Sequence, residues 1–94
     1  MITLTARLTI REGQEQAFEK AVAEIAPQVR AEEGNHAYVF HRASENPREV
    51  FVYEKYSDAA AIDAHRKHMK EIAGALGEVV EGPPKVEIWE EIPV

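Results

Sequence analysis

The chain has 94 residues, no cysteine and a formal net charge of −6 at pH 7. This length suits a single domain, and the lack of cysteine excludes disulfides and thiolate metal sites. An acidic chain without a dense run of Lys and Arg is poorly suited to binding nucleic acid or an anionic membrane surface. No apolar stretch has the length of a secretory or membrane-spanning segment, so we expect a cytoplasmic protein.

The first half of the chain predicts a strand, a helix and a second strand. Apolar and polar residues alternate from Ile2 to Ile10, with the period of a half-buried strand. From Gln14 the apolar spacing becomes helical and predicts an amphipathic helix to about Glu33, closed by Gly34. Pro27 lies inside this helix and predicts a kink there. A second strand is expected from His36 to Ala43.

The second half predicts a strand, a helical region and a last strand. A turn at Glu45-Asn46-Pro47 leads into a strand from Glu49 to Tyr56. Ser57-Asp58 supplies an N-cap for a helix from Ala59 to about Leu76, in one piece or two, before the glycines and prolines that follow. The last strand is expected from Lys85 to Ile92, with Val86 and Ile88 on one face and Trp89 on the other.

The order β-α-β-β-α-β predicts a ferredoxin-like α+β fold in one domain, residues 1–94. Right-handed crossovers would place both helices on one face of a four-stranded antiparallel sheet. The other face would then be uncovered although it carries aromatic residues. A short chain without disulfides gains stability from a partner, so we expect a homodimer in which a second subunit covers this face, a dimeric α+β barrel.

An ordered series of residues is specific enough to suggest a protein family. It consists of Glu32-Glu33-Gly34-Asn35, Tyr38, Pro47, Phe51, Tyr53-Glu54, Tyr56, Asp58 and Ala64-His65. The series resembles the antibiotic biosynthesis monooxygenase superfamily, over nearly the whole chain. Its members include cofactor-free oxygenases of phenolic polyketides, quinol monooxygenases, haem-degrading enzymes and an isomerase of phosphorylated autoinducer-2. Because this family is varied in chemistry, the fold alone does not settle the reaction.

The resemblance implies a cofactor-free monooxygenase that oxidises a small quinol-like or polyphenol-like substrate with dioxygen and needs no metal. The haem-degrading branch is disfavoured: it carries Asn and Trp where this chain has Ala6 and His65, and no histidine follows His68. Members of the family usually show His-x-x-x-x-His on the second helix. Here the spacing is His65-Arg66-Lys67-His68, so His68 is a weaker match than His65.

His65, Glu54 and His68 are the catalytic candidates. A histidine titrates near neutral pH, so His65 suits a base that takes the proton of a phenol, with Glu54 orienting its ring. His65 and His68 lie three apart and share one helix face. The plainer readings are a buried structural histidine and an ordinary salt bridge for the glutamate. Two histidines and Glu54 could also bind iron or zinc, which we consider the least favoured reading.

The substrate-binding candidates are aromatic residues that could enclose a flat ring. They are Tyr38, Phe51, Tyr56 and Trp89, while His36 and His41 are expected at the surface.

Two further functions compete with oxygenation. An isomerase of a small phosphorylated hydroxyketone would use the same His/Glu pair and would need Arg42, Arg66, Lys67 or Lys70 beside the pocket. A barrel that only binds a hydrophobic ligand predicts a closed pocket in which His65 is satisfied by structural hydrogen bonds.

Overall fold

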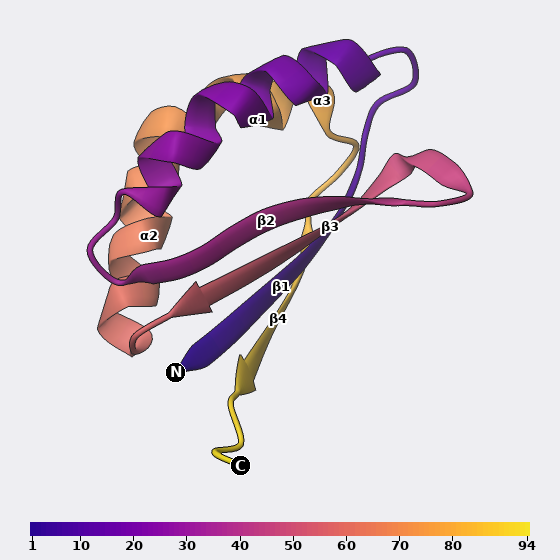
Figure 1. Cartoon of the computed structure of the whole chain (residues 1–94). Coiled ribbons are helices and arrows are strands. Elements are labelled where there is room, and N and C mark those ends of the chain that lie inside the picture. Colours follow the sequence, from indigo (N-terminus) through magenta and orange to yellow (C-terminus); the bar gives the residue numbers. More distant parts are fainter.

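The computed structural model describes residues 1–94 and contains four strands and three helices. In chain order they are β1 (Ile2–Thr9), α1 (Glu15–Arg30), β2 (Asn35–Ala43), β3 (Asn46–Tyr56), α2 (Ala59–Ile72), α3 (Gly74–Val79) and β4 (Lys85–Glu90). Figure 1 shows the helices on one side of the sheet and the two chain ends near each other. No helix is both long enough and apolar enough to cross a lipid bilayer.

The sheet has the strand order β2-β3-β1-β4, and each neighbouring pair is antiparallel. This arrangement confirms the predicted ferredoxin-like α+β fold. The central pair, β1 and β3, aligns Leu4 with Glu54 and Ala6 with Val52. Side chains of directly paired residues lie on the same face of a sheet, so Glu54 belongs to the face that the helices cover.

The core lies between this covered face and α1. Buried residues of the sheet include Leu4 and Val52, and α1 contributes Phe18, Ile25 and Val29. These helix positions follow the three-to-four-residue spacing that predicted the amphipathic helix. Glu54 and His65 are the two buried polar or charged residues of the chain. The fold therefore brings two of the catalytic candidates into its interior.

The end of α1 differs from the prediction. The helix continues past Pro27 but ends at Arg30, three residues before Glu33, where Ala31 closes it through hydrogen bonds to the last turn. The glycine that was expected to cap the helix has a different role. A Cβ atom on Gly34 would lie 2.3 Å from the Cβ of Ala61, so Gly34 is required by the close approach of the chain to α2.

The hairpin between β2 and β3 is tighter than predicted. The turn is at Ser44-Glu45, and Asn46 and Pro47 already belong to β3. The pairing of β3 with β1 begins only at Glu49, so the missing N–H of Pro47 removes no hydrogen bond to β1.

The second helical region consists of two pieces, α2 and α3. Asp58 caps α2 as predicted, because its Oδ1 atom accepts a hydrogen bond from the backbone N–H of Ala61 at 2.9 Å. The break falls at Ala73, and Gly77 lies inside α3 and does not end the helical region. The prediction that Leu76 is near its end was therefore wrong by about one turn.

The last strand is an exposed edge. β4 ends at Glu90, two residues before the predicted Ile92. Glu90 pairs with Ile2, the first residue of β1, so the residues after Glu90 have no partner in that strand. Val86 and Ile88 lie on the predicted face and pair with Ala6 and Leu4, yet both are exposed.

The face of the sheet away from the helices, called here the outer face, also carries exposed apolar side chains, among them Val39, Phe51 and Trp89.

Candidate functional site

A largely apolar cavity of about 500 Å³ lies between the covered face of the sheet and α2. Its apolar wall includes Leu4, Phe40 and Met69. Its polar wall is formed by Tyr38, Glu54 and His65, and the exposed cations Arg66 and Lys70 complete the lining. A few convergent polar groups in an apolar hollow of this size are typical of a small-molecule site.

Glu54 is held in place by its neighbour on the same strand face. The hydroxyl of Tyr56 donates a hydrogen bond of 2.6 Å to Glu54 Oε1, and both residues are buried. Burial raises the pKa of the Glu54 carboxyl to about 7, and the bond from Tyr56 lowers it only in part. Glu54 can therefore gain or lose a proton near neutral pH, which an exposed glutamate cannot do.

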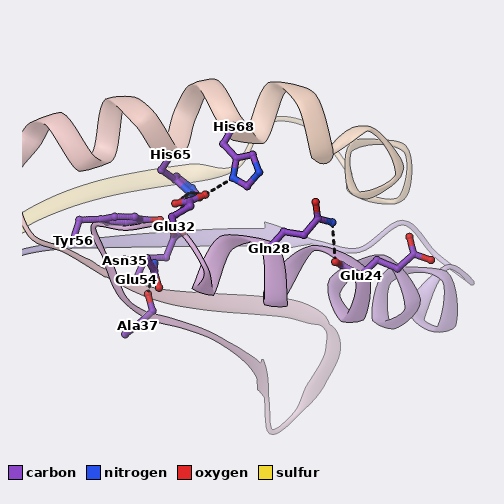
Figure 2. Close-up of polar contacts among 9 residues, drawn as sticks. All are labelled: Glu24, Gln28, Glu32, Asn35, Ala37, Glu54, Tyr56, His65 and His68. Atoms are coloured by element: carbon purple, nitrogen blue, oxygen red, sulfur yellow. Dashed lines mark hydrogen bonds and ion pairs between the residues drawn. The ribbon is translucent and has the colours of Figure 1, made fainter.

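His65 reaches the cavity from α2 and lies between two carboxylates. Its Nδ1 atom is 3.0 Å and 3.1 Å from the two carboxylate oxygens of Glu32, and its Nε2 atom is 3.3 Å from Glu54 Oε1 (Figure 2). The contacts with Glu32 assign the Nδ1 proton to that side, because a carboxylate only accepts. The basic lone pair of a neutral His65 is then on Nε2, the atom that faces Glu54.

Burial and the contact with Glu32 act in opposite directions on the proton affinity of His65. Burial lowers the pKa of His65, whereas the negative charge and hydrogen bonds of Glu32 raise it. The direction that results is a lowered pKa, with Arg66 and His68 adding to it. Together with the raised pKa of Glu54, this favours a protonated Glu54 beside a neutral imidazole over a buried ion pair.

Glu32 is a site residue that the sequence did not single out. Besides His65 it contacts His68, whose Nδ1 atom lies 2.7 Å from Glu32 Oε2. Figure 2 shows the Glu32 carboxylate between the two imidazoles, which project from successive turns of α2. Glu32 belongs to the Glu-x-Gly turn of the resemblance, so the signal was present. Its contact with α2 depends on where α1 ends, which the sequence did not give.

His65, His68 and Glu54, the set considered for iron or zinc, do not form a metal-binding group. Both histidines direct their Nδ1 atoms at the Glu32 carboxylate. No group of three or more potential ligand side chains has an arrangement that could hold a metal ion.

The aromatic candidates separate into two groups. Tyr38 lines the cavity, where burial and the nearby carboxylates raise the pKa of its hydroxyl and keep it protonated. Tyr56 is fully buried and contacts Glu54, not the cavity. Phe51 and Trp89 lie on the outer face, since they pair with Arg7 and Thr3 on the polar side of β1, and so they do not line this cavity.

The other polar candidates are also distributed over the surface. His36 and His41 are exposed as expected, with His36 Nε2 lying 2.7 Å from the hydroxyl of Ser57. Arg42 forms an ion pair with Glu19 outside the cavity, and Lys67 does not line the cavity. Of the four cations considered for a phosphate clamp, Arg66 and Lys70 are beside the site.

Comparisons with known proteins agree with the fold. A comparison with the curated proteins gives no match. Among solved structures, a conserved protein from Methanosarcina mazei superposes with a TM-score of 0.88 at 24% identity, over 97% of this chain and 92% of that one. A protein from Shewanella oneidensis is 30% identical with a TM-score of 0.78, over 94% of this chain and 87% of that one.

The family assignment comes from a sequence model. A protein from Nitrosomonas europaea that is described as an antibiotic biosynthesis monooxygenase superposes with a TM-score of 0.89 at 19% identity, over 99% of this chain and 100% of that one. The model of the antibiotic biosynthesis monooxygenase family matches residues 1–73, which contain Glu32, Glu54 and both histidines of α2. The chain therefore belongs to the antibiotic biosynthesis monooxygenase family.

Proposed function

We propose that the protein is a cofactor-free monooxygenase that oxidises a small quinol-like or polyphenol-like substrate with dioxygen. The observation that carries the proposal is the buried Glu54–His65 pair in the wall of an apolar cavity, where the two side chains lie 3.3 Å apart and the pKa of Glu54 is raised to about 7. The family, whose description names monooxygenases, supports the same reaction class. Family membership alone would not establish it.

The pair would remove the proton of a phenol. The phenolate is electron-rich enough to pass an electron to dioxygen, whereas the neutral phenol is not. His65 Nε2 is the basic atom, and Glu54, when ionised, would act as a second base beside it. The protonated Tyr38 hydroxyl could donate to the substrate oxygen as charge develops there.

The substrate would supply all the electrons, so no external reductant is needed. One oxygen atom forms a new C–O bond on the ring and the other leaves as water. A phenol with a hydrogen at the attacked carbon plus dioxygen gives a quinone plus water, in which the ring loses four electrons and dioxygen gains four. The proton taken by the His65–Glu54 pair returns when water is released.

The proposal is tested by oxygen uptake with a panel of hydroquinones and polyphenols. Wild type should consume oxygen, His65→Gln should reduce the rate about a hundredfold or more, and the exposed control His41→Gln should match wild type. Uptake that His65→Gln retains would refute the assignment of the base. No uptake by wild type with any substrate would refute the oxygenase.

A second function is favoured by one observation. Arg66 and Lys70 line the cavity without forming an ion pair, as an isomerase of a phosphorylated hydroxyketone would require. Such an enzyme would exchange the C–H next to the carbonyl with solvent deuterium under anaerobic conditions. Exchange that falls in Arg66→Gln but persists in Lys67→Gln would support the isomerase. No exchange would exclude it.

A binding protein without chemistry is the remaining alternative. It is consistent with His65, both of whose ring nitrogens lie near a carboxylate. The absence of both oxygen uptake and deuterium exchange would favour it.

We also propose that a second copy of the chain covers the outer face. Trp89 is 51% exposed there, and its indole N–H donates to Thr5 Oγ1 on the same face. Exposed aromatic residues on an uncovered sheet face are typical of a subunit interface. Light scattering should give the mass of a dimer for wild type and of a monomer for Trp89→Lys. A monomeric wild type would refute the proposal.

A further inference from the structure

A continuous series of polar contacts joins the buried site to the protein surface. It starts at Glu54, whose Oε1 atom lies 3.3 Å from His65 Nε2. It continues from His65 Nδ1 to Glu32 Oε1 over 3.0 Å, and from Glu32 Oε2 to His68 Nδ1 over 2.7 Å. Every group in the series can both accept and release a proton, and the Glu32 carboxylate contacts both imidazoles.

Exposure to solvent increases along the series. The side chains of Glu54 and His65 are 6% and 7% exposed, that of Glu32 is 14% exposed and that of His68 is 31% exposed. The cavity end is therefore shielded from water and the His68 end is in contact with it.

We propose that Glu32 and His68 form a proton relay between the buried Glu54–His65 pair and solvent. The proposal rests on the proposed function, because the relay serves a proton taken from the substrate. Glu32 and His68 are positioning and transfer residues here, since neither lines the cavity.

The relay releases one proton to water for each proton that it accepts at the cavity end. When Nε2 of His65 has accepted a proton, the ring is an imidazolium and can release its Nδ1 proton to Glu32. Glu32 Oε2 lies 3.1 Å from His65 Nδ1 and 2.7 Å from His68 Nδ1, so the proton is accepted on this oxygen and leaves from it. His68 first moves its own proton from Nδ1 to Nε2 by exchange with water, then accepts the proton of Glu32 on Nδ1 and releases the one on Nε2 to water. The reverse sequence returns a proton to the cavity. Each ring resets by changing its tautomer.

The charged surroundings are compatible with this transfer. Burial lowers the pKa of His65 and the charge of Arg66 adds to this, which favours release of a proton toward Glu32. Tyr56 donates to Glu54 and does not contact Glu32, so it remains outside the transfer path. Glu32 lies between two histidines with no Lys or Arg in an ion pair with it, so no fixed cation holds its charge.

The relay is tested during turnover by buffer rescue. His68→Gln keeps a polar side chain but cannot carry a proton, and it should lower kcat by roughly tenfold or more with little change in KM. Added imidazole should restore kcat in a concentration-dependent manner. The control His36→Gln, at a histidine outside the series that likewise contacts a polar side chain, should be unaffected. An unchanged kcat in His68→Gln, or a loss that imidazole does not restore, would overturn the relay.

A second measurement does not depend on activity. The His65 ring N–H should exchange with water through Glu32 and His68, so its exchange rate in ¹⁵N-labelled protein should fall several-fold in His68→Gln and in Glu32→Gln. The rate should stay at the wild-type value in His36→Gln. If no substrate is oxidised but exchange slows as expected, the oxygenase fails and the relay stands. Exchange at the wild-type rate in both variants would overturn the relay.

Discussion

Replacing Glu54 by Gln should change how the stability of the protein depends on pH. Burial raises the pKa of Glu54 from 4.5 to about 7, so the folded state binds this proton more tightly than the unfolded state. The resulting stability is fully present below pH 4.5 and is lost as the pH rises through 7. Over that range the loss is about 3 kcal/mol, at 1.36 kcal/mol for each pH unit by which the pKa is raised.

Glutamine resembles the protonated carboxyl in shape and has no charge to gain. The free energy of unfolding of Glu54→Gln should therefore increase by about 3 kcal/mol relative to wild type between pH 4.5 and pH 8. Urea unfolding followed by circular dichroism, at one fixed protein concentration, measures this quantity.

The matched control is Glu33→Gln, because Glu33 is an exposed neighbour of the site. Its stability relative to wild type should not vary with pH in the same range. A Glu54→Gln difference that is constant with pH, or one that changes in the opposite direction, would refute the inference that Glu54 is buried and protonated near neutrality.

Two further predictions concern the segments that position the site. Gly34→Ala should lower the free energy of unfolding by about 1 to 3 kcal/mol, because its Cβ would lie 2.3 Å from the Cβ of Ala61. In Gly77→Ala the new Cβ meets nothing within 4 Å, so this control should be neutral or slightly stabilising in the same thermal unfolding assay; equal losses would contradict the close approach at Gly34. Asp58→Ala should cost about 1 kcal/mol through loss of the α2 cap, and Asp58→Asn should retain most of it. Equal melting temperatures for wild type and Asp58→Ala would contradict the capping role.

The periodicity of the sequence was sufficient to predict the fold. Alternation in β1 and the helical spacing around Phe18 and Ile25 are set by which side chains must be buried, and the structure buries those side chains. Asp58 was predictable as a cap for a local reason, since its side chain bonds to α2 three residues along. The ends of elements were less predictable. Where α1 ends depends on tertiary contacts, including the approach of Gly34 to Ala61.

The candidate site could be predicted only in part. Glu54 and His65 were identifiable because a carboxylate on a buried strand face and a histidine on an apolar helix face are both unusual. The role of Glu32 was not, because its contact with His65 joins the α1–β2 connection to α2, 33 positions further along the chain. Phe51 and Trp89 were candidates for substrate binding because they are aromatic. Their position on the outer face, away from the cavity, follows from the register of the sheet.

We propose above that Glu54 and His65 form a buried pair that exchanges a proton near neutral pH. The most direct test is to follow the ¹³C signal of the Glu54 carboxyl by NMR as the pH is changed, with Glu54→Gln to assign the signal. We predict a titration midpoint of about 7. A midpoint close to the ordinary value of 4.5 would contradict the claim, because an ionised Glu54 could then not exchange a proton with His65 at neutral pH.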